Sequence, residues 1–305
     1  MSAVELLSPE EVRELSRKSD LPGLVRLALH FALLGCTGFL VWACAGTAWI
    51  FSAMFLHGVP LVFLFMPHHE TIHQSAFRSP WLTKAVNWLL GLIVFYPPEY
   101  FRFWHLTHHR FTQDRERDPE IAPPPVKSRG GYLWWVIGLP YLARRTETLK
   151  IALTGKIAKS FVPEHRKAEI VREARIAWTV YLCVAIAAAL TNPWAPVLYW
   201  LGPYVLAQPV LRLYQLAEHT GMEYTDDIFR NTRTTRSNAL VRWLAWNMPY
   251  HTEHHLYPGV PFHALPRLHA LLKDRLPPAS GGYVAVNRGI WRMFSQQQQW
   301  RGGSK

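Results

Sequence analysis

The 15 histidines of this 305-residue chain are concentrated in a few places. Two groups have the spacing HxxHH, a third has HxxxH, and one further histidine stands alone between them. In a helix, residues three and four apart share a face, so each group directs two or three imidazoles toward one point. The nine histidines concerned are His69, His73, His105, His108, His109, His219, His251, His254 and His255.

Imidazole is a ligand for iron, zinc and copper. A structural zinc site takes four ligands, so nine candidates are too many for one ion. The pattern therefore predicts a site for two metal ions. Several other histidines lack partners at ligand spacing, and we expect them to lie outside the site: His30, His165, His263 and His269.

Two stretches of the chain contain no Asp, Glu, Lys or Arg, residues 27–66 and residues 176–211. One helical crossing of a membrane needs roughly 20 residues, so each stretch is long enough for two crossings. Pro193 and Pro196 mark the turn of the second pair. We expect four crossings, arranged as two helical hairpins, near residues 26–45, 47–66, 174–191 and 195–215.

The positive residues indicate the orientation, because Lys and Arg accumulate in cytoplasmic segments. The two expected turns carry none, whereas the segments 67–173 and 216–305 carry many. Both termini, residues 1–23 included, and every histidine group should then lie on the cytoplasmic side, which in a bacterium is that of the inner membrane. The net charge of +12 fits this bias and contact with anionic lipid, so no nucleic acid partner is expected.

These features predict an all-α integral membrane protein that forms one domain over residues 1–305. Its four crossings would carry a cytoplasmic helical cap with the histidine-rich di-metal site. Residues 295–305, with their glutamine run, should be a disordered tail. Cys36, Cys44 and Cys183 fall within the expected crossings and show no paired framework.

Two other functions fit parts of the pattern. His69, Glu70 and His73 also satisfy HExxH, the zinc-binding motif of metalloproteases, but that function leaves seven clustered histidines unexplained. A metal transporter would place its ligands inside the bilayer, whereas these groups lie outside the charge-free crossings. Metal content and uptake assays would separate these functions from an enzyme with two metals.

The three groups resemble the histidine boxes of the membrane fatty acid desaturase and hydroxylase superfamily. The boxes here are His69-Glu-Thr-Ile-His73, His105-Leu-Thr-His108-His109 and His251-Thr-Glu-His254-His255. The residues after the second and third boxes are also similar to the family pattern, and the resemblance covers residues 50–275. His68 with His73 would give the longer first-box spacing, but His69 is favoured because an acidic residue commonly follows the first ligand.

The resemblance implies that the nine histidines ligate two irons. It also implies that Gln215 contacts a metal through water, where family members have Asn or a similar polar residue. A metal-bound imidazole usually donates its second N–H to a carboxylate or carbonyl. The acidic residues expected to accept these hydrogen bonds are Glu70, Asp118, Glu218 and Glu253.

By the same resemblance, the chain is a membrane-bound non-haem di-iron oxidoreductase that desaturates a fatty acyl chain or similar lipid with O2. A hydroxylase or ketolase of a carotenoid, lipid or alkane is the alternative on the same scaffold. The sequence shows no haem-binding His-Pro-Gly-Gly segment of a fused cytochrome b5. We therefore expect a separate electron donor of the ferredoxin or cytochrome b5 type.

Overall fold

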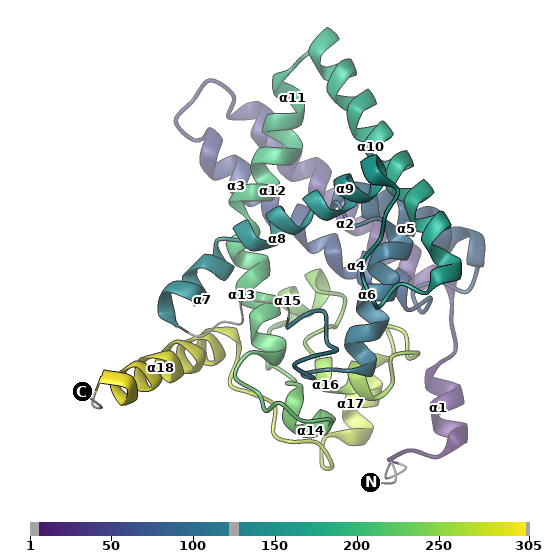
Figure 1. The fold of residues 1–305 in the computed structure, drawn as a ribbon, viewed down its shortest axis with the longest axis vertical. Helices are drawn as coiled ribbons and strands as arrows, with labels where there is room; N and C mark the ends of the chain where they lie inside the picture. The colour runs from purple at the N-terminus through teal and green to yellow at the C-terminus, as the bar shows by residue number, and fades with distance from the viewer. Residues whose placement is uncertain (1–5, 122–127, 303–305) are drawn as a thin grey trace.

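A computed structural model describes residues 6–121 and 128–302, with side chains as far as residue 294. The described chain is helical apart from its loops and one isolated bridge between Thr235 and Ser280. The prediction of an all-α protein is thereby confirmed. Figure 1 shows long helices that project together from one end of the molecule and a compact group of short helices at the other end.

Three helical spans are long and apolar enough to cross a membrane. The first is α2 (Asp20–Ala43). The second runs over residues 50–72 and consists of α3 (Ile50–Phe63) and α4 (Phe65–Ile72). The third runs over residues 164–190 and consists of the short 3-10 helix η1 (Glu164–Arg166) and α10 (Lys167–Leu190).

The fourth predicted crossing, near residues 195–215, is not one continuous helix. It is built from α11 (Trp194–Pro196), the π-helical turn η2 (Val197–Leu201), α12 (Gly202–Leu206) and α13 (Gln208–His219). Proline lacks the N–H that continues a helical ladder, and a proline stands at the start of both α12 and α13. None of these pieces alone has the length of a crossing.

Helix α3 packs against both α2 and α12. Gly58 permits the contact with α12, since a Cβ at this position would lie 2.1 Å from the carbonyl oxygen of Pro203. The buried His57 connects three segments of the bundle, with its Nε2 3.0 Å from the oxygen of Tyr199 and its Nδ1 2.8 Å from Thr37 Oγ1. Helices α2, α3, η2 and α12 therefore pack together.

The cap consists of shorter helices, and two of them, α6 and α16, carry histidine boxes. The cap helices are α5 (Pro80–Ile93), α6 (Pro98–Arg110), α14 (Ile228–Asn231), α15 (Ala239–Leu244), α16 (His251–Leu256) and α17 (Leu265–Leu272). Three further helices, α7 (Arg129–Val136), α8 (Leu139–Arg144) and α9 (Thr146–Thr154), connect α6 to η1. Buried apolar side chains, including Trp246 and Phe262, form the core between these elements.

Both ends of the described chain lie at the cap end of the molecule, opposite the turn between α10 and α11 (Figure 1). The N-terminal helix α1 (Pro9–Leu15) begins with a capping box between Ser8 and Glu11. The C-terminal helix α18 (Tyr283–Gly302) extends into the segment expected to be a disordered tail. The last three residues of that segment, 303–305, lie outside the described residues.

Candidate metal centre

The first histidine group combines five rings from three helices. His69 and His73 come from the end of α4, His105 and His109 from α6, and His254 from α16. One candidate ligand atom from each ring lies within 4.8 Å of all the others. Within the group, His105 Nε2 lies 2.8 Å from His73 Nε2 and 3.0 Å from His109 Nε2.

The second group lies directly beside the first. His108 from α6, His219 from the end of α13 and His255 from α16 have candidate ligand atoms within 4.8 Å of one another. His251 adjoins this group, with its Nε2 3.0 Å from His219 Nε2. The structure therefore brings all nine predicted histidines into one region. The ring of His68 stacks on Phe101 and belongs to neither group.

Helical geometry explains how two boxes supply both groups. On α6, His105 and His109 are four residues apart and belong to the first group, while His108 belongs to the second. On α16 the division is reversed: His254 belongs to the first group, while His255 and the adjoining His251 lie at the second. The rings of His109 and His255 stack between the groups with centroids 4.1 Å apart.

The donor atoms fit metal ions. Imidazole nitrogens 2.8–3.0 Å apart have lone pairs that repel one another when no proton or cation lies between them. Neither nitrogen of the buried His254 has a hydrogen-bond partner among the described residues, and neither does Nε2 of His255. Buried polar atoms without partners are costly, and a bound cation would satisfy them.

The pKa values favour neutral rings, which is the form that binds a metal. Burial lowers the pKa of His73 and of His219 to about 3. Burial also lowers the pKa of each of these rings well below its usual value: His105, His109, His251, His254 and His255. His108 differs, because burial opposes its charge but the carboxylates of Glu120 and Asp118 outweigh burial and raise its pKa to about 9.

Three rings of the second group have their outer nitrogen fixed. His108 Nδ1 lies 3.0 Å from Asp118 Oδ1, and His219 Nδ1 lies 3.1 Å from the carbonyl oxygen of Asn231. Thr112 Oγ1 donates to the carbonyl oxygen of His108, so it can accept from His255 Nδ1, 3.2 Å away. In His219 and His255, Nδ1 therefore carries the proton and Nε2 is free to bind a metal. His108, whose raised pKa favours the doubly protonated ring, has to release its Nε2 proton to bind one.

A model of the fatty acid desaturase family matches residues 40–287, which include all nine histidines. The chain belongs to the fatty acid desaturase family. It is thus a membrane oxidoreductase of the desaturase type, and its histidine groups can bind metal. The family match covers all nine histidines and not only the HExxH segment, so it favours the desaturase interpretation over the metalloprotease interpretation.

Characterised desaturases align with most of the chain. The chain is 26% identical over 295 residues to the sn-1 oleoyl-lipid 12-desaturase of Picosynechococcus, covering 86% of this chain and 78% of that protein. It is 27% identical over 300 residues to the dihydrorhizobitoxine desaturase of Bradyrhizobium elkanii, covering 90% and 80%. It is 22% identical over 272 residues to the sn-1 acyl-lipid omega-3 desaturase (ferredoxin) of Nostoc, covering 80% and 73%.

The four acidic residues expected to support the rings of this desaturase-family chain have different surroundings. Asp118 contacts His108, and Glu218 Oε1 lies 3.6 Å from His251 Nδ1. Glu70 instead ties α4 to the loop before α17, through the Phe262 N–H. Glu253 contacts Thr234 and His269. Glu70 and Glu253 thus hold the helices that carry the histidines, and their hydrogen bonds go to other groups.

Gln215 lies beside the histidines in a small cavity of about 30 Å³, enough for about one water molecule. Its Oε1 accepts a hydrogen bond of 2.5 Å from Arg212. Other polar groups in the cavity come from Glu120 and Glu218. Apolar and aromatic side chains complete the lining: Phe65, Met66, Tyr96, Trp104, Tyr141 and Met248.

Sequence reasoning did not identify Glu120, Thr112 or Asn231. Glu120 Oε2 lies 3.3 Å from His108 Nε2, the nitrogen on the metal side of that ring. Burial raises the pKa of this carboxyl. The sequence offered one signal for Glu120, its position two residues after Asp118. Asn231 acts through its backbone carbonyl, which carries no sequence signature.

Proposed function

We propose that the nine histidines hold two irons and that the chain uses O2 to desaturate a fatty acyl chain or a similar lipid. The observation that carries this proposal is the pair of adjacent, buried histidine groups, both supplied by α6 and α16. Membership of the desaturase family supports it. Five rings would hold one iron, and His108, His219 and His255 with His251 would hold the other.

When bound, two irons would supply the dioxygen chemistry that removes hydrogen from an unactivated C–H bond. The reaction would remove two hydrogen atoms from the lipid to form a double bond. These two hydrogen atoms, with two electrons from a donor and two protons from solvent, would reduce O2 to two waters. The protein contributes buried, neutral imidazoles and an apolar wall that includes Phe65, Met66 and Met248. These side chains limit the access of water to the metal site.

Two polar residues have a place in this site. Gln215, in the cavity beside His69 and His105, is suited to hold a water that contacts an iron, as its position in the chain implies. Glu120, which faces the metal side of His108, is suited to accept a hydrogen bond from such a water. Asp118 and Glu218 would support the rings of His108 and His251.

The electrons would come from a separate protein of the ferredoxin or cytochrome b5 type. The name of the Nostoc relative specifies ferredoxin for that enzyme. We propose the same class of donor for this chain. Basic residues such as Arg233 and Arg236 would suit an acidic donor.

For the membrane topology, we propose four crossings, with α11 to α13 as the fourth and the histidines on the cytoplasmic side. The common position of α1 and α18 at the cap end supports this arrangement (Figure 1). Reporter fusions after Thr191 and after the C-terminus should report opposite sides of the membrane. The same side for both fusions would overturn this topology.

Elemental analysis combined with lipid profiling tests the function. We expect about two irons per chain after gentle purification, and cells that express the protein should gain lipids that lack two hydrogens. A lipid that has gained one oxygen would instead identify a hydroxylase. An active preparation that contains one zinc and no iron would overturn the di-iron proposal.

A further inference from the structure

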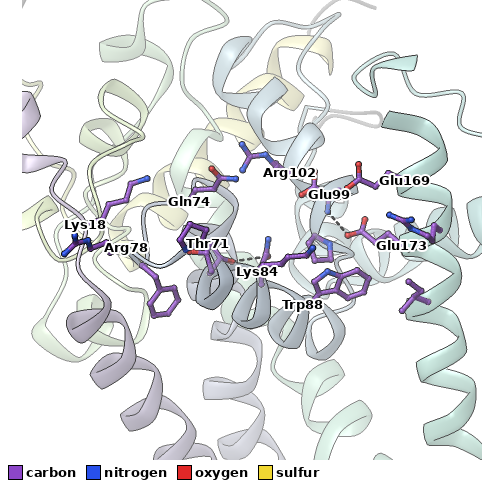
Figure 2. Close-up of a pocket in the computed structure, with 17 residues that line it drawn as sticks. Lys18, Thr71, Gln74, Arg78, Lys84, Trp88, Glu99, Arg102, Glu169 and Glu173 are labelled. Carbon is purple, nitrogen blue, oxygen red and sulfur yellow. Dashed lines mark hydrogen bonds between the residues drawn. The ribbon is translucent and has the colours of Figure 1, made fainter. Parts of the chain in front are cut away.

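An open cavity of about 570 Å³ lies apart from the nine histidines, none of which lines it. Its walls come from five regions: the segment before α2, the end of α4 with the loop that follows, α5, the start of α6, and α10. Figure 2 shows charged side chains from these regions arranged around the opening. The volume falls within the range of small-molecule binding sites.

Positive charge predominates in this cavity. Five cationic residues line it, and none forms an ion pair within 4.0 Å in the described part of the chain. They are Lys18, Arg78, Lys84, Arg102 and Arg172. Arg102 donates to the carbonyl oxygen of Ile72, so its remaining N–H groups are the ones that a ligand can reach.

The three carboxylates in the wall have other partners. Glu173 accepts hydrogen bonds of 2.8 Å and 3.1 Å from the backbone N–H groups of Glu99 and Tyr100, at the start of α6. Glu99 and Glu169 both pair with Arg166, at 2.8 Å and 2.9 Å. Even with these three carboxylates, positive charge predominates among the five cations and Arg166, so the cavity is suited to an anion.

The cavity also lies at the polar end of the membrane helices. Lys18 precedes α2 by two residues, and Arg172 lies four residues before Ile176, where the long charge-free stretch of α10 begins. Trp88 also lines the cavity, and tryptophan is enriched at the membrane–water interface. Lipid headgroups occupy this level of a membrane, and clustered Lys and Arg there attract anionic lipid.

We propose that this cavity binds the phosphate of a membrane amphiphile. Arginine forks and lysine ammonium groups are the side chains that recognise phosphate oxygens. Here they come from five separate regions that surround the opening (Figure 2). A phospholipid in the leaflet and a soluble phosphate ester of an acyl group share this chemistry. The site does not depend on iron, and it can be tested on protein that lacks activity.

The test compares Lys84→Gln/Arg172→Gln with the control Lys273→Gln/Arg288→Gln, which removes the same charge from exposed positions outside the cavity. Full-length protein in detergent is titrated with phosphatidylglycerol or with diacylglycerol, and bound lipid is counted by native mass spectrometry. We expect wild type and control to bind phosphatidylglycerol in preference to diacylglycerol. The cavity variant should bind phosphatidylglycerol about 30-fold more weakly, because it lacks two basic residues and each one near a membrane surface contributes roughly 1 kcal/mol.

Thermal unfolding provides a second readout. Phosphatidylglycerol should raise the melting temperature of wild type and control, but not of the cavity variant, and all three should melt alike without lipid because the exchanged side chains are exposed. If soluble coenzyme A displaces the lipid, the phosphate comes from a soluble ester; if it does not, the ligand is a lipid headgroup. Equal binding of both lipids, or an unchanged affinity in the cavity variant, would overturn the proposal.

Discussion

The two histidine groups are held in place by different means. In the second group, Asp118, Asn231 and Thr112 each engage the outer nitrogen of a ring, while Nδ1 of the adjoining His251 has no hydrogen-bond partner among the described residues. In the first group, Nδ1 of His69, His109 and His254 has no hydrogen-bond partner among the described residues. These rings pack against one another instead, with centroids 4.8 Å apart for His69 and His254.

This difference bears on how each metal would be held. Hydrogen bonds to a carboxylate, a carbonyl or a hydroxyl fix the tautomer and orientation of a ring before a metal binds. Rings without such bonds depend more on packing and on the metal itself for their orientation. We infer that the second group is the better preorganised of the two metal sites.

The largest expected effect separates the two groups directly. His254→Ala should remove the iron of the first group and His255→Ala that of the second, so each variant should retain about one iron or fewer. Turnover should fall by more than about 100-fold in both variants. Loss of a metal ligand should cost more than loss of a hydrogen-bond partner of a ligand, which typically costs about 10–100-fold. Iron per chain and lipid product are the measurements.

His165→Ala is the matched control for these variants, because His165 is exposed and lies far from both groups in the chain. It should keep its iron and its activity. We expect loss of activity for alanine at any of the nine histidines, and His219 is the sharpest case because it lies outside the boxes. A His219→Ala variant with normal iron and turnover would remove this residue from the ligand set.

The next effect tests the preorganisation of the second group. Asp118→Asn keeps the size of the side chain but removes the charge that faces His108 Nδ1, so iron should be lost to a chelator roughly 10–100-fold more readily. Asp114→Asn is the control, since Asp114 pairs with Arg117 at the surface. Equal iron retention by both variants would mean that the carboxylate does not orient this ring.

A smaller effect is expected at Thr112. Thr112→Val removes the hydroxyl that faces His255 Nδ1, whereas Thr112→Ser retains it. A neutral hydrogen bond contributes about 1 kcal/mol, so Thr112→Val should lose iron about fivefold more readily, and Thr112→Ser should behave like wild type. The same iron-release assay measures both variants, and identical behaviour of Val and Ser would show that packing alone orients His255.

The histidine ligands could be predicted from the sequence because their pattern depends on residues that are close together in the chain. Helical spacing alone relates His105 to His108 and His109, and the charge-free stretches place these groups at one end of the helices. The fourth crossing was harder to predict, because hydropathy averages over a stretch and does not show where Pro203 and Pro209 interrupt it.

The partners of the rings depend on tertiary contacts. Asn231 lies 12 residues from His219 in the chain, and Thr112 lies 143 residues from His255. No pattern of residue types specifies a backbone carbonyl as a partner. Glu70 and Glu253 were expected beside the rings because they are acidic and adjacent in sequence, but a neighbour on a helix points in another direction.

His269 gives the smallest expected effect and the finest test of how the groups are supported. The sequence predicts that His269 lies outside the site, because no other histidine is at ligand spacing from it. Its Nδ1 nevertheless contacts the fully buried Glu253 of α16. His269→Ala would leave that carboxylate with Thr234 as its remaining hydrogen-bond partner, which costs on the order of 1–3 kcal/mol. We therefore expect a lower melting temperature with most of the iron and turnover per folded molecule retained.

His263→Ala is the control, because its buried Nε2 has no partner among the described residues, and it should melt close to wild type. A loss of iron in His269→Ala at an unchanged melting temperature would show that this contact orients the histidines of α16 rather than stabilising the fold.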